Sequence, residues 1–219
     1  QYLQNNTKQA ITGFSNYISK FPNGLRALQA NFYLAQLYFA ENADANAIKN
    51  YEFVVNQARN EFTEQALARL CQLYIKTKNN EKAILMLKRL ETEAEFPQNT
   101  TYAQSNLMKL YYDQKEYSNA VIYADKVLNN NKIDDRIKSD AQIIVARAAI
   151  KTNDEPKAKE AYSKLNKIAK GELKAEALYY DAYFKNKEGK YDASNTVVEK
   201  IATDYSGYKF FGAKSLVIM

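Results

Sequence analysis

Few residues in this 219-residue chain could do chemistry on a substrate. The chain has one cysteine, Cys71, and no histidine, so His-based metal sites and mechanisms that need a histidine acid or base are excluded. Because no histidine is available to activate its thiol, Cys71 is expected to be a buried, unreactive residue and not a nucleophile. We therefore predict that the chain is not an enzyme and binds no metal and no cofactor.

Two pairs of acidic residues offer the other candidate chemistry. Glu91 with Glu93, and Asp134 with Asp135, have the residue types of a general acid–base pair or of ligands for a hard cation. Their sequence context favours solvated turns and helix surfaces instead. The 18 tyrosines could stack on a carbohydrate, yet many of them recur at fixed repeat positions, where packing explains them.

The composition favours helices. Hydrophobic residues make up 46% of the chain and charged residues 26%, so a core can form, whereas only 3 prolines and 6 glycines interrupt it. No Asn-Gly or Asp-Gly turn separates alternating β-branched runs, which is the signal of a β-hairpin. We predict an all-α fold.

Charge and hydropathy limit the partners. The net charge of +6 is spread along the chain without a block of like charges, so the pattern does not favour nucleic-acid binding. No apolar stretch approaches the roughly 18 to 20 residues of a membrane-spanning helix, so we expect no direct membrane insertion. No signal peptide is visible at Gln1, and Ser206 to Met219 reads as the opening of another helix. Both ends thus read as cut, and the expected compartment is the periplasm or cell envelope, with the cytoplasm as the alternative.

An internal repeat organises the chain. Small residues recur at spacings of 37, 36, 37, 38 and 36 residues, and a fixed period in this range indicates stacked repeats. We call these residues the small-residue row: Ala10, Ala47, Ala83, Ala120, Ala158 and Ser194. Apolar residues stand four and seven places after most of them, which places them on one face of a helix.

Another helix precedes each of these from the second repeat onward. Twelve places before each small residue stands a second small or soft residue, in a row formed by Ala35, Cys71, Met108, Ala146 and Ala182. Small residues at a crossing let two helices approach closely. One helix pair leaves an apolar face bare, so we expect the stacking of repeats to supply the core.

Turn residues separate the predicted helices. Asn79-Asn80 and Gly189-Lys190 read as polar turns inside a repeat, and Pro156 reads as the first turn of a helix. Phe21-Pro22 and Phe96-Pro97 read as stops after the second helix of a repeat, because proline cannot continue a helix.

The chain resembles the tetratricopeptide repeat family along essentially its whole length. The most specific segments are Asn31 to Tyr38 and Glu188 to Asp192. The Phe-Pro pair followed by Ala30 to Tyr38 is similar to tetratricopeptide domains of bacterial envelope proteins that attend outer-membrane assembly and cell division. The abundance of Asn, Lys, Ile and Tyr suggests an AT-rich bacterial genome, such as that of a Bacteroidota species.

The resemblance implies a right-handed superhelical solenoid of helix-turn-helix repeats, an α-α superhelix. The chain is then a single array, with approximate repeats at 1–27 (the second helix of a truncated repeat), 28–63, 64–100, 101–138, 139–173, 174–206 and 207–219 (the start of a further repeat).

The sixth repeat departs from the family pattern. Asp181 and Lys185 stand where an aliphatic and an aromatic residue are expected, and the tryptophan common in this family is absent throughout. We expect this helix to be shifted by one residue, so that Ala177, Tyr180 and Phe184 point inward. Weak packing of the helix is the alternative.

The first helices of such a solenoid line a concave groove. The positions expected to face the groove lie fifteen, eleven and eight places before each small residue. They select Phe32, Gln36, Phe39, Ala68, Gln72, Ile75, Ser105, Lys109, Tyr112, Ile143, Arg147 and Ile150. Packing beneath adjacent repeats is the competing role for Phe32, Phe39, Tyr112 and Ile150.

This surface would combine an apolar floor with Gln and basic residues, which suits a peptide or helix with apolar anchors and some acidic character. The Lys and Asn positions that clamp a C-terminal carboxylate in known family grooves are not matched. One of those rows is occupied instead by Phe32, Ala68, Ser105 and Ile143. We predict a non-catalytic scaffold that binds a partner protein, in cell-envelope assembly. The alternative is a structural spacer or oligomerisation module within a longer repeat protein.

Overall fold

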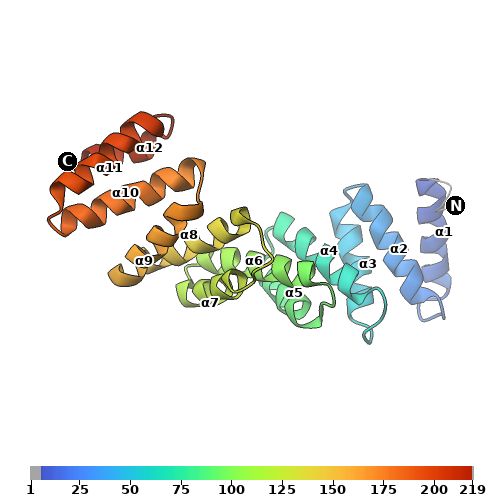
Figure 1. Cartoon of the computed structure of the whole chain (residues 1–219). Helices are drawn as coiled ribbons and strands as arrows, with labels where there is room; N and C mark the ends of the chain where they lie inside the picture. The colour runs from blue at the N-terminus through green and yellow to red at the C-terminus, as the bar shows by residue number, and fades with distance from the viewer. Residues whose placement is uncertain (1–5, 219) are drawn as a thin grey trace. The chain divides into compact units, whose positions relative to one another are not determined.

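The computed structural model describes residues 6–218, and every regular element in that range is an α-helix (Figure 1). The helices are α1 (Thr7–Lys20), α2 (Ala27–Ala40), α3 (Asp44–Val55), α4 (Thr63–Lys76), α5 (Asn80–Glu93), α6 (Pro97–Asp113), α7 (Tyr117–Leu128), α8 (Asp135–Lys151), α9 (Glu155–Ile168), α10 (Gly171–Lys187), α11 (Tyr191–Asp204) and α12 (Lys209–Leu216). The predicted all-α class is confirmed.

The chain forms two compact units, an N-terminal unit up to Ala103 and a C-terminal unit from Gln104 onward. In the N-terminal unit α1 packs against α2, α2 against α3, α3 against α4, and α4 against α5. The helices α7 to α11 do the same in the C-terminal unit, where α12 packs against α10 and α11. Packing between sequence neighbours is what a repeat array requires.

Five turns of the same design join the first and second helices of the hairpins. Each turn has three residues, and the middle residue has a left-handed backbone, with φ of 58° at Asn42, 57° at Lys78, 63° at Lys115, 57° at Asn153 and 75° at Gly189. The residue that follows donates its N–H to a carbonyl near the helix end, as Asn79 does to Tyr74 at 2.9 Å. This is the hydrogen bond of a Schellman cap, which ends a helix and reverses the chain.

The core lies between the hairpin helices, on the rows that the repeat spacing predicts. All six members of the small-residue row are buried, and so are all five residues twelve places before them. Large side chains such as Tyr51, Leu87 and Tyr162, four places after their small residues, are also buried. Close helix contact at the small residues therefore creates the space that the large residues fill.

Of the residues predicted to point inward from α10, Ala177 and Phe184 are buried and Tyr180 is half-buried. The predicted shift by one residue is nevertheless wrong, because Ala182 is fully buried in its expected row and α10 keeps the register of the other first helices. The exception is the pair Asp181 and Lys185, which form an ion pair of 2.8 Å at the helix surface. A salt bridge along one helix face replaces the apolar pair, without any change of register.

Candidate functional site

The residues predicted to face a groove divide into a buried pair and an accessible majority. Phe32 and Ile143 are only 3% and 6% exposed. The ring of Phe32 stacks on that of Phe62 with 4.3 Å between centroids and meets the edge of Tyr51. Both residues therefore belong to the core, and neither is available to a partner. The accessible residues, half-buried or exposed, are Gln36, Phe39, Ala68, Gln72, Ile75, Ser105, Lys109, Tyr112, Arg147 and Ile150.

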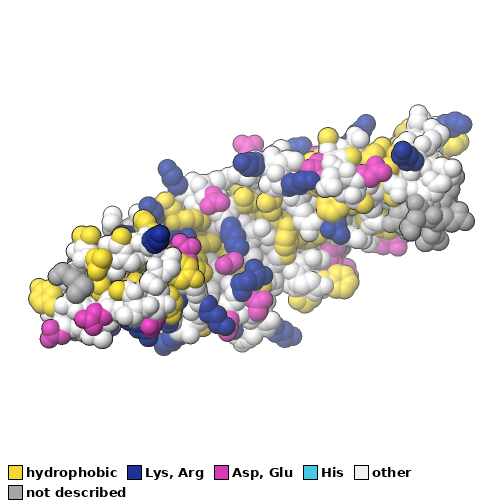
Figure 2. Space-filling view, turned by 90° about the horizontal axis from the view of Figure 1, so that it is seen from above, with side chains coloured by type: hydrophobic (Ala, Val, Ile, Leu, Met, Phe, Trp, Pro, Cys, Tyr) yellow, Lys and Arg dark blue, Asp and Glu magenta, His cyan; other side chains and the backbone are white. Residues whose placement is uncertain are grey.

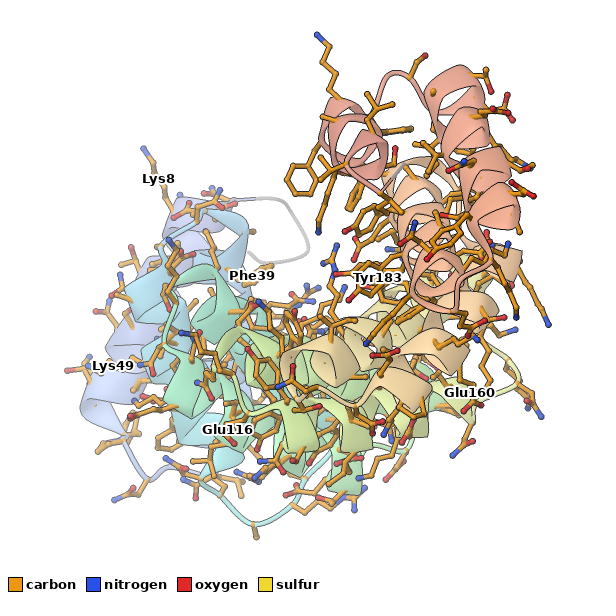
Figure 3. The ribbon with its side chains drawn as sticks, turned by 90° about the vertical axis from the view of Figure 1, so that its left-hand side faces the viewer. Lys8, Phe39, Lys49, Glu116, Glu160 and Tyr183 are labelled. Atoms are coloured by element: carbon orange, nitrogen blue, oxygen red, sulfur yellow. The ribbon has the colours of Figure 1, made fainter. Side chains whose placement is uncertain are left out.

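Within each unit, the first and second helices present their side chains on different sides. In Figure 3, Phe39 of α2 lies on the opposite side of the N-terminal unit from Lys49 of α3. Tyr183 of α10 likewise lies on the opposite side of the C-terminal unit from Glu160 of α9. In each unit the labelled side chain of the first helix therefore points away from that of the second helix, and we call the side that it occupies the first-helix face.

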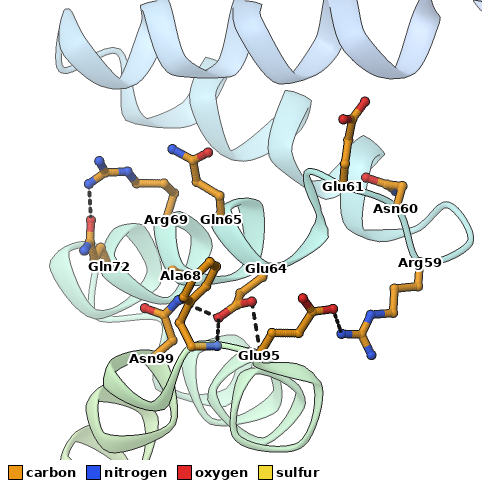
Figure 4. A pocket seen from close by; sticks show the side chains of 11 residues that line it. Arg59, Asn60, Glu61, Glu64, Gln65, Ala68, Arg69, Gln72, Glu95 and Asn99 are labelled. Atoms are coloured by element: carbon orange, nitrogen blue, oxygen red, sulfur yellow. Dashed lines mark hydrogen bonds and ion pairs between the residues drawn. The ribbon is translucent and has the colours of Figure 1, made fainter.

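The N-terminal unit contains a polar recess of about 490 Å³ on this face, between α4, the loop before it and the start of α6 (Figure 4). We call it the N-terminal recess. Its wall includes Arg59, Glu64, Gln65, Arg69, Gln72 and Asn99, with Ala68 at its base. Two predicted residues, Ala68 and Gln72, are therefore brought to one cavity.

Glu64 in this recess caps the start of α6. Its carboxylate accepts hydrogen bonds from Asn99 Nδ2 at 2.7 Å and from the backbone N–H groups of Glu95 and Phe96 at 3.0 and 3.1 Å. Desolvation raises the pKa of Glu64, but these hydrogen bonds together outweigh it and lower the pKa. A carboxylate at a helix N-terminus satisfies donors that have no partner inside the helix.

Arg69 carries the charge of the same wall. Its Nη1 donates to Gln72 Oε1 at 2.9 Å, and its guanidinium lies 4.6 Å from the ring centroid of Phe39. A guanidinium over an aromatic face is held by the ring quadrupole while its other N–H groups stay available. The predicted residues Phe39 and Gln72 are thus joined through an arginine that the row pattern did not select.

The C-terminal unit has a second recess on its first-helix face, with a volume of about 250 Å³. We call it the C-terminal recess. Its wall includes Tyr112, Arg147, Ile150, Tyr180, Phe210 and Lys214. The first three of these are predicted residues from two helices, α6 and α8. Figure 2 shows hydrophobic side chains at the surface of this unit, with Lys and Arg between them.

Arg147 is fixed in the C-terminal recess by a buried acid. Its Nε and Nη2 donate to the two carboxylate oxygens of Glu176 at 2.9 and 2.5 Å. Tyr162 Oη donates to the same carboxylate at 2.9 Å. The bidentate hydrogen bond to Glu176 raises the pKa of Arg147, while desolvation and the Glu176 charge raise the pKa of Tyr162. Arg147 stays charged and Tyr162 stays protonated.

An aromatic cluster with a lysine forms the opposite wall. The ring of Tyr180, which is half-buried, stacks on that of Tyr162 at 4.1 Å. Lys214 Nζ lies 4.4 Å from the ring centroid of Tyr179, 5.6 Å from that of Tyr180 and 5.8 Å from that of Phe210. The sequence reasoning missed Glu176, Tyr180 as a wall residue, Phe210 and Lys214. The available signal was the continuation of the same rows into α10, where Tyr179 and Tyr183 stand.

Cys71 and most of the acidic residues that the sequence offered for catalysis make contacts that stabilise the helices. The predicted burial of Cys71 is confirmed, and desolvation raises the pKa of its thiol to about 12. Asp134 caps α8 by accepting the N–H of Ile137 at 2.8 Å. Glu93 pairs with Arg89 at 2.9 Å along α5. Asp135 lies 3.9 Å from Lys138, one turn further along α8.

Two further findings concern residues 6–218 alone. No group of three or more His, Cys, Asp and Glu side chains in this range is arranged to hold a metal ion. None of the helices in this range has the length and hydropathy of a bilayer-crossing helix.

Comparison with known proteins gives structural likeness without sequence likeness. No protein-family model and no curated protein matches the chain. A tetratricopeptide repeat protein from Parabacteroides merdae is similar with a TM-score of 0.56 and 17% identity, over 91% of this chain and 74% of that one. PilF from Pseudomonas aeruginosa gives 0.57 and 19%, over 97% and 92%. PilW, a type IV pilus biogenesis factor, gives 0.56 and 11%, over 98% and 93%. At these identities the likeness establishes the fold alone.

Proposed function

The chain has the tetratricopeptide-repeat fold, and on that basis we propose that it is a non-catalytic scaffold that binds a segment of a partner protein. The segment, a peptide or a helix, lies on the faces of the first helices. The N-terminal unit offers Gln36, Phe39, Gln72 and Ile75 for this contact. The C-terminal unit offers Lys109, Tyr112, Arg147 and Ile150.

The observation that carries this proposal is the convergence of Tyr112, Arg147 and Ile150 on one recess. Tyr112 comes from one repeat and Arg147 and Ile150 from the next, yet the three residues form one wall that combines apolar and cationic groups. Recesses of this composition are where interface residues contribute most binding energy, because an apolar anchor is desolvated beside a directed charge. An array that served only as a spacer would have no need for such a recess.

The setting that we propose is cell-envelope assembly. PilW, whose fold this chain shares, is a type IV pilus biogenesis factor, and tetratricopeptide arrays suit assembly because an extended surface can hold a partner without catalysis.

The test compares two double variants of the chain as bait in the envelope fraction of the native organism. Tyr112→Ala with Ile150→Ala alters the C-terminal recess. Leu85→Ala with Ile122→Ala removes apolar groups that are 57% and 53% exposed on the second helices α5 and α7, and serves as the matched control. The partner captured by the wild type is then purified, and its dissociation constant is measured with all three proteins.

We expect the recess variant to bind the partner about tenfold more weakly or worse, as hot-spot truncations do, with an unchanged melting temperature. The control should bind like the wild type. Equal binding by both variants would contradict the proposal. Self-association that only the Leu85 and Ile122 variant loses would favour the spacer or oligomerisation module.

A further inference from the structure

We propose that the C-terminal recess recognises a partner segment in which a carboxylate side chain stands next to an aromatic or large aliphatic one. Arg147 binds the carboxylate, and the Tyr180 and Phe210 wall takes the apolar neighbour. This inference rests on the proposed function, since it names the chemistry of the segment that the scaffold binds.

The guanidinium of Arg147 is oriented before any partner arrives. Two of its nitrogens are held by Glu176, whose carboxylate is also held by Tyr162. Nη1 of Arg147 donates to no protein group among the described residues, and the side chain is 43% exposed at the recess wall. A guanidinium fixed on one edge offers its other edge without first losing side-chain entropy, which favours recognition of a carboxylate.

The burial of Glu176 indicates that this orientation has a use. The whole residue is 4% exposed, in a helix whose neighbouring positions are apolar. Burying an ion pair contributes little to stability compared with well-packed apolar residues, because both charges lose hydration. The Tyr162, Glu176 and Arg147 chain is therefore better explained by the position that it gives to Arg147 than by stability.

The charge of the recess selects an anion. Its cationic residues are Arg147, Lys151 and Lys214, and its acidic residue is Glu176, which is already paired with Arg147. An excess of two positive charges remains beside the rings of Tyr180 and Phe210. Electrostatic complementarity then favours an acidic segment and disfavours a basic one.

The size of the recess favours a peptide over a nucleic acid. A cavity of about 250 Å³ holds one or two side chains, whereas single-stranded nucleic acid needs a cationic groove along several nucleotides and open ring faces for successive bases. One face of Tyr180 is already covered by Tyr162.

The test selects a phage-displayed library of random peptides on the full 219-residue chain. Enriched sequences are synthesised with the acidic residue intact or replaced by its amide, and their dissociation constants are measured by fluorescence polarisation. The protein variants are Arg147→Lys, which keeps the charge and a partner for Glu176 but loses the planar fork, and Lys214→Gln. Lys164→Gln, which removes an exposed lysine on the second helix α9, is the matched control. A labelled single-stranded DNA oligonucleotide is assayed in parallel, and thermal melting shows that each variant is folded.

We expect enriched peptides to carry Asp or Glu beside an aromatic or large aliphatic residue. Replacement of the acid by its amide should weaken binding about tenfold, the effect typical of a charge-assisted hydrogen bond. Arg147→Lys should have a similar effect, Lys214→Gln an effect of roughly two- to fivefold, and Lys164→Gln none. High salt should weaken the binding of the acidic peptide and leave the binding of its amide form nearly unchanged.

Other outcomes separate this inference from the proposed function. Peptides without an acid, or peptides whose binding ignores Arg147 and Lys214 but needs Phe39 or Gln72, would overturn the inference and leave the scaffold proposal standing. A library that yields no binding peptide would count against both. Oligonucleotide binding that is lost in Arg147→Lys would assign the recess to nucleic acid and overturn the inference.

Discussion

Glu64 of α4 accepts a 2.7 Å hydrogen bond from Asn99 in the first turn of α6, 35 residues further along the chain. The same carboxylate accepts two backbone N–H groups just before that helix. The first helix of one hairpin, α4, therefore supplies a side-chain cap for the first helix of the next hairpin, α6.

Replacement of Glu64 by glutamine should destabilise the chain by about 1 to 2 kcal/mol, because the amide keeps one acceptor and turns a donor toward other donors. Thermal and urea unfolding measure this loss. Glu61→Gln is the control, since Glu61 lines the same recess but is exposed. Equal stability of the two variants would show that the cap contributes nothing.

Acid should act through the same residue. The pKa of Glu64 is lower in the folded chain than its ordinary value of 4.5, so below that value the unfolded chain takes up the proton more readily than the folded one. Stability is therefore full above pH 4.5 and falls as the pH drops through the folded pKa. Unfolding of the wild type and of Glu64→Gln across this range should show a shallower decline in the variant. If the stability of the two proteins declines in parallel as the pH falls, Glu64 is not responsible for the acid sensitivity.

Two lysines occupy turn positions that suit glycine. Lys78 and Lys115 have φ of 57° and 63°, where a side chain is strained, whereas glycine is not. Lys78→Gly or Lys115→Gly should stabilise the chain by roughly 0.5 to 1 kcal/mol, and the two should be additive because the sites are in different hairpins. Denaturant melts measure the gain.

Gly189 is the matched control for this prediction. Its φ is 75°, and a Cβ added there would meet no atom within 4 Å, so any effect of Gly189→Ala comes from the backbone alone. We expect a loss of about 1 kcal/mol. If alanine is tolerated without loss, the turn does not require glycine, and the expected gain at Lys78 and Lys115 has no basis.

The ion pair in the C-terminal recess should show strong energetic coupling. Arg147→Met leaves the carboxylate of Glu176 buried with only the hydroxyl of Tyr162, which should cost about 3 to 5 kcal/mol. Adding Glu176→Gln removes the uncompensated charge and keeps an acceptor for Tyr162, so the double variant should be more stable than Arg147→Met alone. Urea unfolding of the wild type, both single variants and the double variant gives the coupling energy of the pair as a double-mutant cycle. A double variant that is less stable than the single one would argue against this account.

Cys71 should resist thiol reagents until the chain unfolds. Its thiol is fully buried, and desolvation raises its pKa from 9.0 to about 12. At neutral pH a reagent therefore cannot reach the sulfur, and the reactive thiolate form is not populated. Because the unfolded chain loses this proton near pH 9, the neutral thiol contributes stability that is lost as the pH rises above 9. The rate of modification by an aromatic disulfide reagent, with and without denaturant, measures the protection. A cysteine at exposed Ser118, in a Cys71→Ala background, is the reactive control, and equal rates would contradict the prediction.

The fold could be predicted because its signals are local. A helix of 3.6 residues per turn fixes which side chains share a face, and so the small-residue row and the row twelve places earlier were predicted as core and are buried. The turns carried a weaker signal. Asn79-Asn80 and Gly189-Lys190 predicted two of them. The left-handed turn residue Lys115 could not be predicted, because lysine is not a residue type that favours this conformation.

The sequence by itself determined the all-helical class, the repeat spacing and the faces on which Tyr112, Arg147 and Ile150 lie. Only the tertiary structure decided that Phe32 is covered by Phe62, that α10 keeps its register, and that Glu176 and Lys214 meet Arg147 and the aromatic wall at one recess. The physical reason is that periodicity orients a side chain relative to its own helix. What stands opposite that side chain depends on how the next hairpin packs, and that is set by contacts between residues about thirty positions apart.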